Sequence, residues 1–183
     1  MANIVSEGER FTRILIPSGT FQAVCFDNWD IGHQPVVWQG QTKYMPKTII
    51  GWELSEIHEA GELTGKRMTI FKKYTKSLAE TARLRKDLES WRGKIFTPEE
   101  LKGFDLDKLI GVNCMISVVH NESEGKTYAN IASVSGLMKG LTPLQPENQH
   151  ATPNWISRLQ EAAKKYQPTE NVAEAPVNDE EVP

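Results

Sequence analysis

The fold of this chain is constrained chiefly by the order of its segments with strand-like and helix-like hydrophobic periodicity. Three segments with the two-residue period and the aromatic and β-branched content of strands come first, a segment with a helical period follows, and two strand-like segments end the series. In chain order these are 11–31, 43–56 and 67–75, then 77–92, then VNCMISVVHN and KTYANIASVSG. This is the order of a five-stranded Greek-key barrel of the OB type, with a helical insert between strands 3 and 4. The sequence therefore predicts a mainly β, OB-type domain over residues 1–140.

Capping signals predict two helical starts in the insert. Ser77 and Glu80 have the spacing of a capping box, and Gly93 stands where a helix would end. A second box begins at Thr97, with Pro98 at the first helical position, and predicts a short helical passage to about residue 110.

The chain changes character after residue 140. Prolines recur at 143, 146, 153 and 168, which predicts a linker over 141–166 rather than further sheet. Within this linker, Asn154 precedes a short amphipathic helix whose Trp155, Ile156 and Leu159 are available to dock. Residues 167–183 lack aromatic residues and carry five acidic and no basic residues, so we expect a disordered acidic tail.

The formal net charge of −3 averages over segments of very different charge. Residues 66–94 carry ten Lys or Arg and three Asp or Glu, a local net charge of +7. Such a cationic zone in a near-neutral fold favours a polyanionic partner.

Catalytic, metal-binding and membrane-spanning patterns are not found. The four histidines are scattered, and neither a GxSxG motif, an HExxH motif nor a glycine-rich phosphate loop occurs. Cys25 and Cys114 lack metal-ligand spacing, which indicates a reducing compartment, and the Asp27/Asp30 pair is more typical of a turn than of a metal site. No run of about 18 apolar residues occurs. We expect a protein that is not an enzyme, has no cofactor or metal, and has no membrane partner.

Strands two and three of an OB barrel carry its usual oligonucleotide-binding face, and here they interleave aromatic and basic residues. Binding a single strand needs cations along the phosphates and flat rings on which bases stack, at about 1–3 kcal/mol per base. The candidate nucleic-acid-binding residues are Lys43, Tyr44, Lys47, Arg67, Phe71, Lys72, Lys73, Tyr74, Lys76, Arg85 and Arg92.

Each candidate also has a plainer interpretation. Aromatic residues are more often buried than exposed, and Trp52, in phase with Ile50 and Leu54, is the one most expected in the core. Phe71 is the better stacking candidate because Lys72 and Lys73 follow it directly. The cations of the helix 77–92 could equally form a solvated face, and Trp29 and Trp38, in or near the loop after the first strand, could supply further rings.

A string of motifs covers residues 74–140. It has an aromatic-Thr-x-Ser opening, a Leu-Arg-x-x-Leu helix, Trp-Arg-Gly-Lys, a Phe-Asp-Leu turn and Gly-Lys-x-Tyr-Ala-x-Ile. In this chain these begin at Tyr74, Leu84, Trp91, Phe104 and Gly125, and GTFQAVCFDNWDIGHQ and IIGWELSE extend the match upstream. In these motifs the chain resembles a family of small phage-encoded proteins that accompany replication and recombination genes. It departs from them near Gly40, where WQGQTKY replaces a more basic loop.

The resemblance implies an OB-fold protein that binds single-stranded DNA and coats replicating phage genomes in the bacterial host cytoplasm. The acidic tail, with Asp179, Glu180 and Glu181, is similar in design to the tails of bacterial single-stranded-DNA-binding proteins. Such a tail would recruit replication or recombination proteins, and the alternative is a tail that only aids solubility. The sequence leaves two further possibilities open: a homo-oligomer, and an OB-fold protein-interaction module that does not bind DNA.

Overall fold

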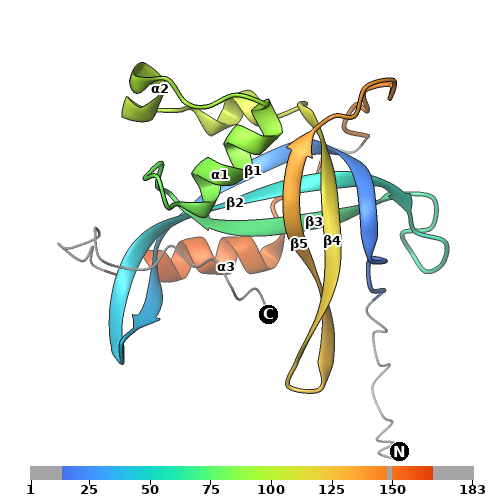
Figure 1. Cartoon of the computed structure of the whole chain (residues 1–183). Helices are drawn as coiled ribbons and strands as arrows, with labels where there is room; N and C mark the ends of the chain where they lie inside the picture. The colour runs from blue at the N-terminus through green and yellow to red at the C-terminus, as the bar shows by residue number, and fades with distance from the viewer. Residues whose placement is uncertain (1–13, 148–149, 167–183) are drawn as a thin grey trace, which may run out of the picture.

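Five antiparallel strands form the framework of the protein (Figure 1). The computed structural model describes residues 14–147 and 150–166. The strands are β1 (Gly19–Trp38), β2 (Gln41–Ile57), β3 (Arg67–Thr75), β4 (Asn113–Ser123) and β5 (Lys126–Gly136). They form one open sheet in the order β3-β2-β1-β4-β5, and every neighbouring pair is antiparallel. This confirms the prediction of a mainly β chain, and the sheet is consistent with a β-barrel-like fold.

The helical insert lies between β3 and β4, as predicted. It consists of α1 (Arg83–Arg92), α2 (Pro98–Lys102) and a 3-10 turn, η1 (Leu106–Leu109). The capping box at Thr97 is confirmed, because Thr97 Oγ1 accepts from the Glu100 amide at 3.2 Å and Glu100 Oε2 accepts from the Thr97 amide at 3.0 Å.

The predicted helix start at Ser77 is wrong. The first helix begins at Arg83, after Ala82, whose side chain offers no capping acceptor. Ser77 Oγ instead accepts from the amide of Ala79 at 3.1 Å, which satisfies a local turn. A serine that caps such a turn has the same local sequence signature as a helix cap.

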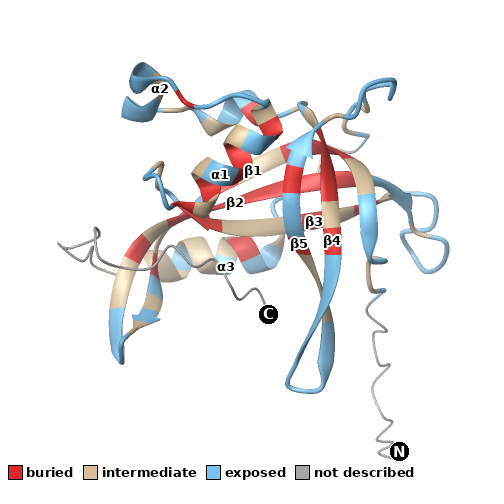
Figure 2. Ribbon diagram, viewed as in Figure 1, coloured by how far each residue is buried: buried red, intermediate tan, exposed pale blue. Residues whose placement is uncertain are grey.

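Apolar side chains are buried in two clusters, one shared with α1 and one with a later helix. Figure 2 shows buried residues along the strands and in both helices. The α1 side holds the main core, in which Trp52 is fully buried, as predicted, and packs against Trp91 of α1 with ring centroids 5.7 Å apart. Leu84 and Leu88 of α1 complete this contact. Each fully buried side chain of this size stabilises the fold by about 1.5–3 kcal/mol, so α1 fastens this side of the sheet.

A last helix, α3 (Asn154–Ala163), lies across the opposite side of the sheet (Figure 1). Ile156 of α3 is fully buried there, in a smaller cluster with Ile31, Ile49 and two aromatic residues of β1. The amphipathic helix expected within 141–166 is therefore present and docks on the sheet of its own chain.

The chain before α3 also lies on the sheet. Asn113 of β4 accepts from the amide of Leu144 at 2.7 Å and donates to its carbonyl at 2.8 Å. Arg67 of β3 donates to the carbonyl of Gln145 at 2.8 Å. Parts of the stretch predicted as a linker thus contact the sheet. The predicted acidic tail, residues 167–183, lies outside the described residues.

A bulge in β1 decides which of its side chains lie on the α3 side. The ladder with β2 shifts register between Cys25 and Asp27, so Phe26 is an extra residue. Strict alternation from Phe26 would put residues 28 and 30 on its side, but the shift turns Trp29 and Ile31 there instead. Phe26 and Trp29 therefore share one face of the sheet.

Among the described residues, no helix has both the length and the apolar character needed to cross a bilayer.

Candidate nucleic-acid interface

Strand alternation divides the predicted binding residues between the two sides of the sheet. Tyr74 is a core residue, 1% exposed, and its hydroxyl donates to Asp87 Oδ2 of α1 at 2.8 Å. Lys72 lies on the same side, with Nζ 3.0 Å from the same oxygen. Arg83 Nε reaches the other oxygen, Asp87 Oδ1, at 2.9 Å. Tyr74 is therefore not available to stack on a base, because its ring and hydroxyl join α1 to the sheet.

Two more predicted cations, both in the helical insert, are held by acidic partners. Arg85 pairs with Glu89 at 3.0 Å, and Arg92 pairs with Glu100 while its guanidinium lies over the ring of Phe96, 4.4 Å from the centroid. The hydrogen bond from Arg85 holds the pKa of Glu89 below its usual value. These two ion pairs stabilise the helical insert. Either arginine would have to give up its pair in order to bind a phosphate.

Arg67 and Lys47 also have internal roles. Arg67 lies 2.8 Å from Glu147 and 3.4 Å from Glu53. Lys47 is buried, with its Nζ donating to Thr75 Oγ1 at 2.7 Å.

Phe71 and Lys73 lie on the α3 side, next to the two rings that the β1 bulge places there. We call Phe26, Trp29 and Phe71 the aromatic face. Its ring centroids are 5.8 Å apart for Phe26 and Trp29, 5.8 Å for Phe26 and Phe71, and 5.9 Å for Trp29 and Phe71. Sequence reasoning chose Phe71, considered Trp29 and missed Phe26, because alternation alone does not reveal a bulge.

Cations stand at the border of the aromatic face. Lys73 is paired with Ile49 in the ladder, and Ile49 with Trp29, so the lysine and Trp29 belong to one cross-strand row. Lys76, which follows β3, has its Nζ 2.6 Å from Asp30 Oδ2 on β1. Although partial burial alone would raise the pKa of Asp30, the hydrogen bonds from Lys76 and from the Gly32 amide lower it by more.

Gly51 of β2 makes room for the aromatic face. It is paired with Asp27 at the β1 bulge and with Phe71 on β3. A Cβ atom at this position would stand 2.9 Å from Phe26 Cζ and 3.0 Å from Trp29 Cζ3. The two rings can approach the strand this closely only because this residue has no side chain.

Residues 150–166, which we call the C-terminal segment, cover the aromatic face. His150 lies against Phe26 with ring centroids 4.1 Å apart, and Trp155 meets Phe71 edge-on at 5.5 Å. The indole Nε1 of Trp29 donates to Thr152 Oγ1 at 3.2 Å.

A similar contact occurs at the β1–β2 hairpin, where two other predicted residues lie. Tyr44 stacks on Tyr166 of the C-terminal segment, with centroids 5.0 Å apart and an interplanar angle of 25°. Lys43 and Trp38 are half-exposed nearby, and Val37 is 73% exposed.

Glu53 anchors the start of the C-terminal segment. This fully buried carboxylate accepts from the amide of Glu147 at 3.0 Å and is hydrogen-bonded to His150 Nε2 at 2.6 Å. A buried carboxylate keeps such donors because an unpaired one is costly.

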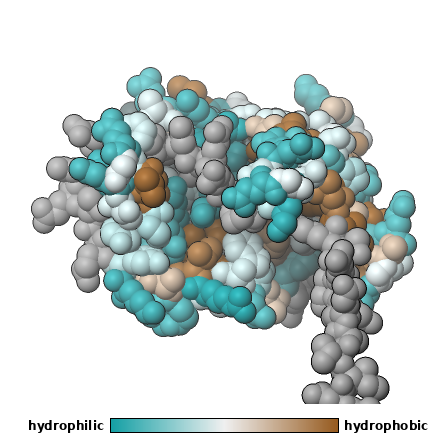
Figure 3. Space-filling view, turned by 90° about the horizontal axis from the view of Figure 1, so that it is seen from below, coloured by the Kyte–Doolittle hydropathy of each residue, from teal (hydrophilic) through white to brown (hydrophobic). Residues whose placement is uncertain are grey.

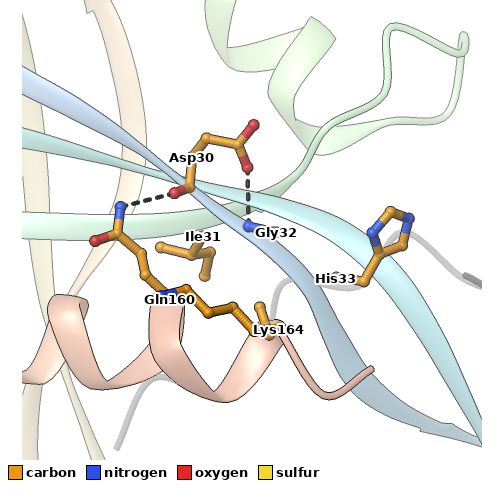
Figure 4. Close-up of a pocket in the computed structure, with 7 residues that line it drawn as sticks. Asp30, Ile31, Gly32, His33, Gln160 and Lys164 are labelled. Carbon is orange, nitrogen blue, oxygen red and sulfur yellow. Dashed lines mark hydrogen bonds between the residues drawn. The ribbon is translucent and has the colours of Figure 1, made fainter. Parts of the chain in front are cut away.

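A depression of about 370 Å³ separates the far end of α3 from β1 (Figure 4). Its lining residues are Asp30, Ile31, Gly32, His33, Gln160, Ala163 and Lys164. Gln160 Nε2 donates to the carbonyl of Asp30 across this seam, at 2.9 Å. Viewed from below, the molecule shows hydrophobic patches among hydrophilic side chains (Figure 3), so this side is neither wholly apolar nor wholly charged.

Comparisons with known proteins return no match, neither to a family model nor to a curated protein.

Proposed function

We propose that this chain binds single-stranded DNA without catalysis, with little sequence preference, in phage DNA replication or recombination. The observation that carries the proposal is the aromatic face: three rings within 6 Å of one another, with Lys73 in the same cross-strand row as Trp29. Flat rings that accept bases and amines that neutralise phosphates are the two parts that such binding needs.

The strand order supports an OB-type barrel as the finer description of the fold. In that barrel β3 and β5 are neighbours, and here they are the two outer strands of the open sheet. Two side chains reach from the β3 and α1 side to β5: Lys72 Nζ donates to the carbonyl of Ile131 at 3.3 Å, and Arg83 donates to that of Ala132. One ring of the aromatic face, Phe71, belongs to β3, and strands 2 and 3 carry the oligonucleotide-binding face of OB barrels, which supports the proposal.

The acidic tail completes the proposal. Asp179, Glu180 and Glu181, which lie outside the described residues, would recruit basic surfaces of replication or recombination proteins. The resemblance to phage replication-module proteins supports this role and the bacterial cytoplasm as its location.

Titration of fluorescein-labelled oligo-dT tests the proposal, with salt varied and Phe71→Leu compared with the wild type. We expect binding that weakens steeply with salt, and a loss of roughly tenfold in affinity for Phe71→Leu, because leucine keeps the apolar volume but not the flat ring. Phe104→Leu is the matched control, since Phe104 is also half-buried but packs on Phe96 in the helical insert. Absence of binding at low salt would refute the proposal, and equal affinity of both variants would move the site elsewhere.

A second candidate, a protein-interaction module, is favoured by α3 itself. The docked helix demonstrates that this side of the sheet accepts an amphipathic helix. Recovery of a stoichiometric protein partner after nuclease treatment, from a protein that binds no oligonucleotide, would support this alternative.

A further inference from the structure

We propose that the C-terminal segment is a built-in competitor of single-stranded DNA: it occupies the aromatic face with rings of its own and leaves when bases stack there. This inference rests on the proposed function and names the regulation of the same site. It assigns to residues 150–166 a role that differs from that of the acidic tail.

The rings of the segment stand where bases would. His150 lies over Phe26, Trp155 against Phe71 and Tyr166 over Tyr44, so three sheet aromatics each have one ring partner from this short stretch. The Phe26–His150 and Tyr44–Tyr166 pairs are the closest, at 4.1 and 5.0 Å between centroids. A base and one of these side chains cannot occupy the same ring face, so binding of the two is mutually exclusive.

The docking of α3 is also weak enough to reverse. Of the described residues of α3, Ile156 alone is fully buried, and Trp155 remains 40% exposed, whereas α1 buries four residues. Pro153, the residue that precedes the helix, has no side-chain acceptor to cap it. Elements with few buried contacts are the ones that open locally.

Undocking would remove a few hydrogen-bond partners from polar groups of the sheet and would expose these groups to water. Trp29 Nε1 and Gln34 Nε2 would lose Thr152 and the carbonyl of Leu159, at 3.2 and 3.0 Å. Glu53 would lose His150 but keep Arg67 and the amide of Glu147. Because the partners of the buried carboxylate are not all on the segment, its departure does not leave that charge unpaired.

A single added carbon atom at Gly32 would weaken the docking of α3 on β1. A Cβ at Gly32 would stand 2.8 Å from the Cβ of Ala163, so Gly32→Ala presses α3 away from β1. Gly65→Ala is the matched control, because Gly65 has a similar positive φ of 82°, against 66° for Gly32, and nothing within 4 Å of its added Cβ. Both variants therefore carry the backbone strain of alanine at positive φ. Only Gly32→Ala adds a close contact with α3.

The experiment measures oligo-dT affinity for the full-length wild type and both variants. We expect Gly32→Ala to bind severalfold more tightly than Gly65→Ala, because a face that is covered for less of the time has a higher apparent affinity. Trp155→Ala should do the same relative to Arg158→Ala, an exposed position on the same helix. This second pair covers the case in which Gly32→Ala does not fold.

Hydrogen exchange of the wild type supplies a readout that needs no variant. Saturating oligo-dT should speed exchange of the α3 amides, whereas a merely structural helix would keep or increase its protection. DNA binding with unchanged α3 exchange and equal affinities within each pair would overturn the inference and leave the proposed function standing. Absence of DNA binding by all five proteins would overturn both.

Discussion

Lys72 and Lys73 are neighbours in the chain, yet β3 turns them to opposite sides of the sheet. Lys72 joins Asp87 and Tyr74 on the α1 side, whereas Lys73 belongs to the row of Trp29. Consecutive basic residues in a strand therefore lie on opposite sides of the sheet, where they have different roles. The two-residue period was visible in the sequence, but the acidic partner that holds Lys72 was not, since Asp87 is distant in the chain.

Replacing Lys72 by alanine should lower stability rather than DNA affinity. The variant leaves Asp87 with Tyr74 and Arg83 as donors, so we expect a loss of about 1–3 kcal/mol in the free energy of unfolding, measured by urea denaturation. Lys86→Ala, at an exposed position of α1, should stay within about 0.5 kcal/mol of the wild type. A stable Lys72→Ala protein with weakened DNA binding would contradict this assignment.

At the scale of elements, the bulge in β1 and the glycine opposite it form the aromatic face together. The order of strands and helices and the burial of Trp52 followed from sequence periods, because both depend on local patterns. The bulge at Phe26 and the docking of α3 did not, since each is decided by packing between distant segments. Gly51, which lies opposite the bulge, has no side chain and so permits the close approach of the two rings.

Gly51→Ala should therefore destabilise the protein by overpacking. The added methyl group would stand about 3 Å from the rings of Phe26 and Trp29, so we expect a loss of about 1–3 kcal/mol in thermal or urea unfolding. Gly103→Ala is the control, because its φ of 176° suits any residue and its added Cβ meets nothing within 4 Å. Equal stability of the two variants would show that the rings of Phe26 and Trp29 can move away from the added methyl group without loss of folding free energy.

At the scale of the whole molecule, β1 and β4 each place one thiol in the main core. Cys25 and Cys114 are both fully buried and not disulfide-bonded. Burial raises the pKa of Cys25 to about 12 and that of Cys114 strongly in the same direction. Both thiols therefore stay protonated in the folded protein near neutral pH, and their ionisation at mildly alkaline pH reports on unfolding.

These thiols should make the protein less stable in alkali. The folded state keeps their protons, whereas the unfolded state loses them near pH 9, so their contribution is complete below about pH 9 and declines as pH rises from there toward 12. Urea unfolding at pH 8 and pH 10.5 should show a steeper decline for the wild type than for a Cys25→Ala/Cys114→Ala protein. Native protein should also resist a thiol reagent at pH 8, and rapid labelling of the folded state would contradict the burial.

The side chains that reach β5 have a consequence for how copies of the protein behave toward one another. An edge strand normally has unpaired backbone carbonyls that can accept hydrogen bonds from the backbone of another extended chain. Such edge-to-edge pairing leads to aggregation of β proteins. The carbonyls of Ile131 and Ala132 already accept from Lys72 and Arg83. A second extended chain would have to displace these two cations to add to the sheet there, so this border of the sheet disfavours edge-to-edge association of copies.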